Sequence, residues 1–173
     1  SNSTCVQIAE SKSEKPTGEK AVMEQRVIAA LKADPQMRQY FINKIAAPIA
    51  LYPDDLVGII LPATTNPLQL VQADRYLDKR KADPKLPVDE KWDDPVKSLL
   101  NYPDVVKMMS ADLDWTTALG EAVVADQGAV IEAVQAFRRK AQAVGNLKSD
   151  DKQVVKVEQE IVYIEPADPQ VVY

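Results

Sequence analysis

The sequence has no histidine and only one cysteine among its 173 residues. Without histidine, the chain lacks the usual general base near neutral pH, the Ser-His-Asp and Cys-His nucleophile systems, and the commonest metal ligand. A single cysteine excludes an internal disulfide and a cysteine-rich zinc site. We therefore expect a non-enzymatic protein with no cofactor and no metal.

The chain also lacks an excess of positive charge and any long hydrophobic run. It carries 26 acidic and 21 basic side chains, a net charge of -5. Nucleic-acid binding needs a basic face to neutralise phosphates, so we expect no nucleic-acid partner. No apolar run approaches the ~20 residues of a membrane span, so we expect no transmembrane segment.

Residues 1–20 are rich in Ser, Lys, Glu and Thr and predict a disordered leader. Ser1-Asn2 looks like the scar left by protease cleavage of an expression tag, so we expect that a signal peptide has been removed. Cys5 then lies in a tail. It is either a spectator thiol or a lipid-anchored cysteine near a mature N-terminus.

Proline is abundant, with 12 residues, and its placement predicts several short helices. Asp34-Pro35, Asn66-Pro67 and Asp94-Pro95 each place a capping side chain before a proline, which is typical of a helix start. Apolar spacing predicts a helix over 19–33. Further helices are predicted to begin at Pro35, near Pro53 (ending at Pro62), and at Pro67, Pro95 and Pro103.

Two more helices are predicted over 113–125 and 129–144, with a joint at Gly128 and a left-handed stop at Gly145. We interpret the basic runs 79–81 and 138–140 as solvated helix faces.

After Asn146 the pattern changes to short segments rich in Val, Ile and Tyr. Residues 153–157 and 161–164 predict strands, and 171–173 would begin a third strand after a turn bracketed by Pro166 and Pro169. The fold class is therefore mainly α. We expect a bundle of about seven or eight short helices over 21–148, then a small β-ribbon over 149–173.

The tripeptide Tyr-Pro-Asp occurs twice, at 52–54 and 102–104, each time after apolar residues and before a helical pattern. The favoured interpretation is a duplicated structural corner, in which Pro sets the first helical φ and Asp meets the positive end of the helix. The alternative is a ligand-binding corner with both tyrosine hydroxyls facing one groove.

Paired carboxylates could act as acid and base, although helix capping explains most of them. Asp54, Asp104, Asp112 and Asp114 are the acids to inspect for such a role. The segment from Asp112 begins like a calcium loop but has Thr117 and Val123 where Gly and Glu are needed. The two tryptophans, Trp92 and Trp115, each lie beside an acid and serve either core packing or recognition.

An ordered series of motifs resembles the domain-of-unknown-function 3300 family. The segments that carry the resemblance are 47–56 (APIALYPDDL), 67–68, 73–77 (ADRYL), 92–93, 96–97, 102–105 (YPDV), 108–110 (MMS), 112–116 (DLDWT), 118–120 (ALG), 143, 145–148 (GNLK) and 164–173 (IEPADPQVVY). The resemblance implies an exported bacterial envelope protein made with a signal peptide. It implies no activity and no catalytic residues.

The sequence thus favours a periplasmic or envelope-associated interaction or scaffold module whose partner is a protein or another envelope component. The candidate binding surface contains Tyr52, Tyr102, Trp92 and Trp115. Two alternatives stay open. One is a carboxylate-dependent hydrolase of envelope glycan, which needs two acids roughly 5–10 Å apart in a cleft. The other is a structural tether that pairs through its C-terminal strands.

Overall fold

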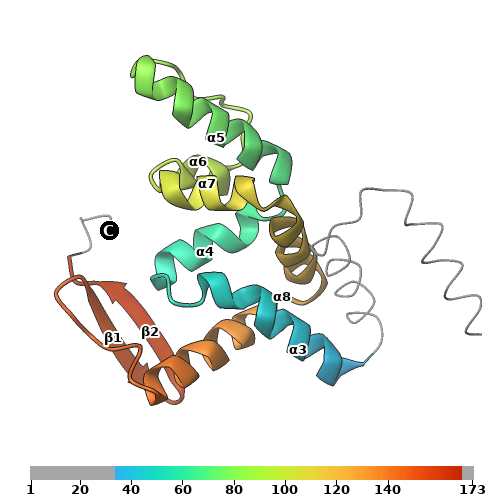
Figure 1. The fold of residues 1–173 in the computed structure, drawn as a ribbon, viewed down its shortest axis with the longest axis vertical. Coiled ribbons are helices and arrows are strands. Elements are labelled where there is room, and N and C mark those ends of the chain that lie inside the picture. The colour runs from blue at the N-terminus through green and yellow to red at the C-terminus, as the bar shows by residue number, and fades with distance from the viewer. Residues whose placement is uncertain (1–33, 169–173) are drawn as a thin grey trace, which may run out of the picture.

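The computed structural model describes residues 34–168 and confirms a mainly α fold with a two-stranded antiparallel sheet at its C-terminal end (Figure 1). The elements are α3 (Pro35–Ala46), the 3₁₀ turn η1 (Ala47–Ile49), α4 (Asp54–Ala63), α5 (Pro67–Ala82), α6 (Asp94–Leu99), α7 (Pro103–Ala111), α8 (Leu113–Ala143), β1 (Gln153–Glu158) and β2 (Ile161–Pro166). The predicted helix over 19–33, the leader, Cys5 and the predicted strand over 171–173 lie outside the described residues.

The predicted proline starts are correct in position but only partly in their capping. Asp34 caps α3, since its carboxylate accepts a hydrogen bond from the Gln36 amide at 2.9 Å. Asn66 precedes α5 without a side-chain cap bond. Helix α6 begins at Asp94 itself, one residue before the proline, and its N-cap residue Asp93 also makes no cap bond. Pro62 lies inside α4, which ends one residue later than predicted.

The two helices predicted over 113–125 and 129–144 lie within α8, on the two sides of a kink. The break lies at Asp126 (φ -162°, ψ 85°), two residues before the predicted joint at Gly128. The Asp126 carboxylate accepts a hydrogen bond from the Ala129 amide at 3.0 Å and pairs with Arg38 of α3 at 3.4 Å. The Asp126 side chain thus caps the second half of the helix at the break.

The helices pack in a stack. Helix α5 packs on α7 at one end, α4 contacts α6 and α8, and α3 lies along α8, as Figure 1 shows. Their buried faces form one continuous hydrophobic core. Helix α8 approaches the end of α4 closely at Gly120, where a Cβ atom would lie only 2.9 Å from the Thr64 carbonyl carbon.

The C-terminal ribbon is a β-hairpin that packs on α8 and α4. Its register pairs Val157 with Val162 and Val155 with Ile164. The two-residue turn has positive φ at Gln159 (50°) and Glu160 (70°), the conformation of a type I′ turn that matches the twist of the strands. Val162 and Ile164 are fully buried in a second, small core. The hairpin is thus held by the helical core, as an isolated ribbon would need to be.

Helix α8 ends at the predicted left-handed stop. Gly145 has φ +79°, and the Asn146 amide donates back to the Ala141 carbonyl at 2.8 Å.

In residues 34–168, no single helix has the length and apolar character to cross a membrane. The pair 35–49 and 54–63 passes that test only when combined across a bend of 118°.

Candidate functional site

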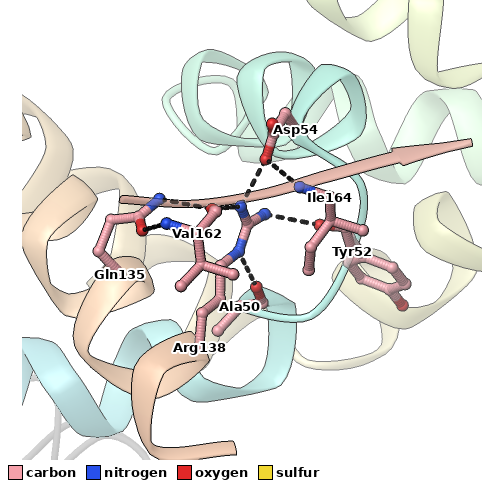
Figure 2. Close-up of polar contacts among 7 residues, drawn as sticks. All are labelled: Ala50, Tyr52, Asp54, Gln135, Arg138, Val162 and Ile164. Atoms are coloured by element: carbon pink, nitrogen blue, oxygen red, sulfur yellow. Dashed lines mark hydrogen bonds and ion pairs between the residues drawn. The ribbon is translucent and has the colours of Figure 1, made fainter. Parts of the chain in front are cut away.

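Arg138 of α8 is the centre of the most extensive polar cluster, which Figure 2 shows. The side chain is 2% exposed. Its Nε donates to the Ala50 carbonyl at 2.7 Å, and its terminal nitrogens donate to the carbonyls of Tyr52 and Val162, both at 2.8 Å. A terminal nitrogen also forms an ion pair with the Asp54 carboxylate. The guanidinium therefore joins α8 to the start of α4 and to β2.

The same cluster bonds the outer edge of β2. The Val162 amide donates to the Gln135 side chain at 2.7 Å, and the Gln135 amide returns a bond to the Val162 carbonyl at 3.2 Å. The Ile164 amide donates to the Asp54 carboxylate at 3.3 Å. Side chains from α8 and α4 thus bond the backbone N–H and C=O groups of β2 that a third strand would otherwise bond.

This cluster is suited to holding structure rather than to chemistry. An arginine stays charged in proteins and offers a rigid fork of donors, which here meets three carbonyls and one carboxylate. The carboxylate of Asp54 is engaged by Arg138 and by the hairpin backbone. The positive charge of Arg138 on α8 is compensated by the negative charge of Asp54 on α4, and both side chains also bond the backbone of β2.

The interpretation of 138–140 as a solvated face is wrong for Arg138, which is buried. The signal was present in the spacing, because Val130, Val134, Arg138 and Ala141 follow one another at intervals of four, four and three. Arginine at a position on the apolar stripe of a helix indicates a buried cation that needs several acceptors.

A second candidate site is an open groove of about 530 Å³ between α5 and the connection that follows it. We call it the Trp92 groove. Its lining consists of Gln72, Arg75, Tyr76 and Lys79 from α5, the segment 86–89, and Trp92. The Tyr76 and Trp92 rings meet edge to face, with centroids 5.7 Å apart and planes at 84°.

Hydrogen bonds fix the connection against α5 and so preform the groove. The Tyr76 hydroxyl donates to the Leu86 carbonyl at 2.8 Å, and Trp92 Nε1 donates to Gln72 Oε1 at 3.0 Å. The groove therefore has aromatic residues at its base, an aliphatic wall from 86–88 and a polar wall from α5.

The α5 wall carries two exposed cations, Arg75 and Lys79, four residues apart and hence on one face of the helix. Within residues 34–168 neither side chain forms a hydrogen bond or an ion pair. Asp89 is the one acid that lines the groove. In a chain of net charge -5, the groove wall is thus locally cationic.

The four aromatic candidates do not gather in one cavity. Trp92 is buried, 7% exposed, and lines the groove, whereas Tyr52, Tyr102 and Trp115 are half-buried against the main core. Trp115 Nε1 donates to the Ile45 carbonyl at 2.8 Å, and the Tyr52 hydroxyl lies 3.9 Å from Met108 Sδ. Both tryptophans therefore pack into the core, the first of the two roles weighed for them.

The four acid candidates lie at helix starts. Asp54 is in the first turn of α4, Asp104 in that of α7 and Asp114 in that of α8. Asp112 caps α8, accepting from the Trp115 amide at 3.2 Å. The two Tyr-Pro-Asp corners differ, because Asp54 meets Arg138 while Asp104 is exposed.

Two smaller cavities lie elsewhere. One, of about 220 Å³, lies between α4 and α8 beside Asp54 and Arg138. The other, of about 380 Å³, is mostly apolar and lies between the start of α5 and the first half of α8, with Glu121 on its wall. Counting only residues 34–168, the groove and both cavities are each lined by a single carboxylate. No group of three His, Cys, Asp or Glu side chains in residues 34–168 could hold a metal ion.

A family model described as "Protein of unknown function (DUF3300)" matches residues 38–173. The chain belongs to the DUF3300 family. The resemblance found in the sequence is thereby confirmed. A relative, the uncharacterized protein YacH of Escherichia coli (strain K12), is 37% identical over 119 residues, which are 66% of this chain and 19% of YacH. This DUF3300 chain thus spans about a fifth of that relative. No solved structure matches it.

Proposed function

We propose that this chain is a non-enzymatic interaction module of the bacterial cell envelope, and that it binds a protein partner in the Trp92 groove. The observation that carries the proposal is a pair of exposed cations, Arg75 and Lys79, whose side chains have no partner within residues 34–168 and lie on the wall of a preformed groove of about 530 Å³. That volume is within the range of ligand-binding clefts.

Preorganisation supports binding. Besides the bonds from Tyr76 and Trp92, the Asp93 amide donates to Gln69 Oε1 at 2.9 Å, so both ends of the connection are attached to α5. A partner that enters the groove does not have to order this connection. The entropic cost of association is lower for a surface fixed in its bound form.

The placement of the acids favours binding over glycan hydrolysis. Hydrolysis by paired carboxylates needs two acids that face one substrate cleft. Among the residues that the structure describes, one carboxylate lies on the wall of the groove and one on the wall of each of the two smaller cavities, and Asp54 is engaged by Arg138.

The edges of the hairpin also argue against a tether that adds a partner strand. The outer edge of β2 is bonded by Gln135, Arg138 and Asp54. On β1, the Val155 amide donates to Ser149 Oγ at 2.9 Å and the Gln153 amide to the Asp150 carboxylate at 2.9 Å. A partner strand would have to displace these side chains.

The resemblance to exported bacterial proteins supports the envelope location. The test is fractionation of the natural full-length protein, tagged at its C-terminus and expressed in its own bacterium. Release by osmotic shock, or recovery with the membranes, would support an envelope location. Recovery only with the cytosol would contradict it.

The binding role is tested by photo-crosslinking in living cells. A photoreactive amino acid replaces Val88, which lines the groove, or Lys107, which is exposed on α7 as the matched control position. We expect a discrete protein adduct from position 88 that is absent from position 107. The adduct should disappear when Arg75→Glu and Lys79→Glu are added. An adduct unaffected by these changes, or none at position 88, would refute the proposal.

A further inference from the structure

We infer that the Trp92 groove takes an extended peptide segment with two acidic side chains at alternate positions and apolar residues beside them. This inference rests on the proposed function and names the chemistry of the partner. The acids would meet Arg75 and Lys79, and the apolar residues would lie against the wall formed by 86–88.

The spacing of the two cations indicates the peptide conformation. Residues four apart on a helix have Cβ atoms about 5–6 Å apart. In an extended chain, side chains two positions apart point to the same face and are separated by about 6–7 Å. Arg75 and Lys79 therefore match acids separated by one residue. Adjacent acids in an extended chain would point to opposite faces.

The aliphatic wall and the size of the groove favour a peptide over a small free anion. A lone phosphate or carboxylate would use the cations but would not cover the parts of Leu86, Pro87 and Val88 that line the groove. A groove of about 530 Å³ accommodates several side chains of a peptide, whose apolar groups gain from burial against this wall.

The aromatic base of the groove disfavours a sugar. Recognition through an aromatic platform needs an accessible ring face, but Trp92 is 7% exposed and meets Tyr76 edge to face.

The charge distribution disfavours an anionic membrane surface. The chain is negative overall, with net charge -5, and Asp89 lines the groove. Arg75 and Lys79 could attract a few anionic groups, but the rest of the protein would repel an extended anionic surface.

The experiment measures binding of two fluorescent decapeptides to the full chain by anisotropy. One peptide carries two glutamates separated by a proline and flanked by valines, and the other replaces both glutamates with glutamine. We expect the acidic peptide to bind about tenfold more tightly, from two exposed ion pairs. A third peptide, with the two glutamates adjacent, should bind more weakly than the first.

The matched protein variants have the same change in net charge. Arg75→Glu with Lys79→Glu should weaken the acidic peptide by about tenfold or more, whereas Lys107→Glu with Lys140→Glu should change affinity by less than about twofold. Lys107 and Lys140 are exposed on α7 and α8 and do not line the groove. Circular dichroism would confirm that both variants fold.

Each contrary result overturns a defined part of the proposal. Equal binding of the acidic and glutamine peptides, or equal effects of the two double variants, would refute the acidic-peptide inference. So would binding to vesicles of anionic phospholipid that depends on Arg75 and Lys79 while the peptides do not bind. If the peptides fail but the groove adduct at position 88 forms, the proposed function stands and only this inference falls. If both fail, both are wrong.

Discussion

Arg138 and Asp54 lie 84 residues apart in the sequence and form the ion pair that joins α8, α4 and the hairpin (Figure 2). The Arg138 side chain is 2% exposed and that of Asp54 35% exposed, so the pair spans from the interior to the surface. Burying such a pair is favourable only when other hydrogen bonds satisfy the charged groups, as three carbonyls do here.

Removal of the cation should be strongly destabilising. Arg138→Ala leaves the carbonyls of Ala50 and Tyr52 without their side-chain donor and Asp54 without its counter-charge. It also removes one of the two side-chain donors to the Val162 carbonyl. We expect the free energy of unfolding to fall by about 3–5 kcal/mol, the range for breaking a buried pair. Urea denaturation followed by circular dichroism measures it.

Its neighbour provides the control. Arg139 is partly exposed and pairs at the surface with Glu132, so Arg139→Ala should cost less than about 1 kcal/mol. Similar losses for the two alanine variants would contradict a central structural role for Arg138.

The Gln135 side chain should protect the Val162 amide, on the outer edge of β2, from hydrogen exchange. In Gln135→Ala, the Val162 amide loses its acceptor and the Val162 carbonyl loses one of two donors. We expect faster hydrogen exchange at the Val162 amide, with a global stability loss of about 1–2 kcal/mol. Amide exchange followed by NMR measures both. Unchanged protection at Val162, against the unaltered protein as reference, would show that this contact does not hold the hairpin.

The sequence predicted the elements well because their signals are local. Pro35, Pro67 and Pro103 begin helices as expected, and Gly145 has the left-handed conformation that ends α8. The joint in α8 lies at Asp126, two residues before Gly128, because the Asp126 carboxylate caps the Ala129 amide and also pairs with Arg38 of α3. The ion pair with another helix is not visible in the local sequence.

The sites depended on contacts that only the fold creates. The basic run 138–140 predicts a surface position for Arg138, whereas the partners that hold it in the interior lie 24 to 88 residues away in the sequence. Trp92 was identified as a candidate, but Arg75 and Lys79 join it only when Tyr76 and Gln72 hold the connection against α5. The tryptophan at position 92 is recognisable in the sequence as a candidate for binding. The placement of Arg75 and Lys79 beside it follows only from the fold.

The hairpin turn offers a stabilising change. Gln159 and Glu160 both have positive φ, a conformation in which non-glycine residues are strained and Asn-Gly is preferred. Gln159→Asn with Glu160→Gly should raise the stability by about 1 kcal/mol, measured as a higher midpoint of thermal unfolding. The Glu160 carbonyl, which accepts from Arg139 at 3.2 Å, is retained.

Replacing a glycine at another left-handed position, Gly145, also tests whether backbone strain at positive φ limits stability. Gly145 has φ +79° with nothing within 4 Å of a built Cβ, so Gly145→Ala meets strain without a clash. It should lose about 1 kcal/mol. If neither change shifts the midpoint in the stated direction, backbone strain does not limit stability at these turns.

Two glycines inside helices should respond oppositely to alanine. At Gly120 a Cβ would lie 2.9 Å from the Thr64 carbonyl carbon and closer still to its oxygen, whereas at Gly58 nothing lies within 4 Å. Gly120→Ala must separate α8 from the end of α4, and we expect a loss of about 2–3 kcal/mol. Gly58→Ala should gain about 0.5–1 kcal/mol from helix propensity. Urea denaturation of both variants measures the difference, and a neutral Gly120→Ala would show that the two helices are not in the close contact that positions the core.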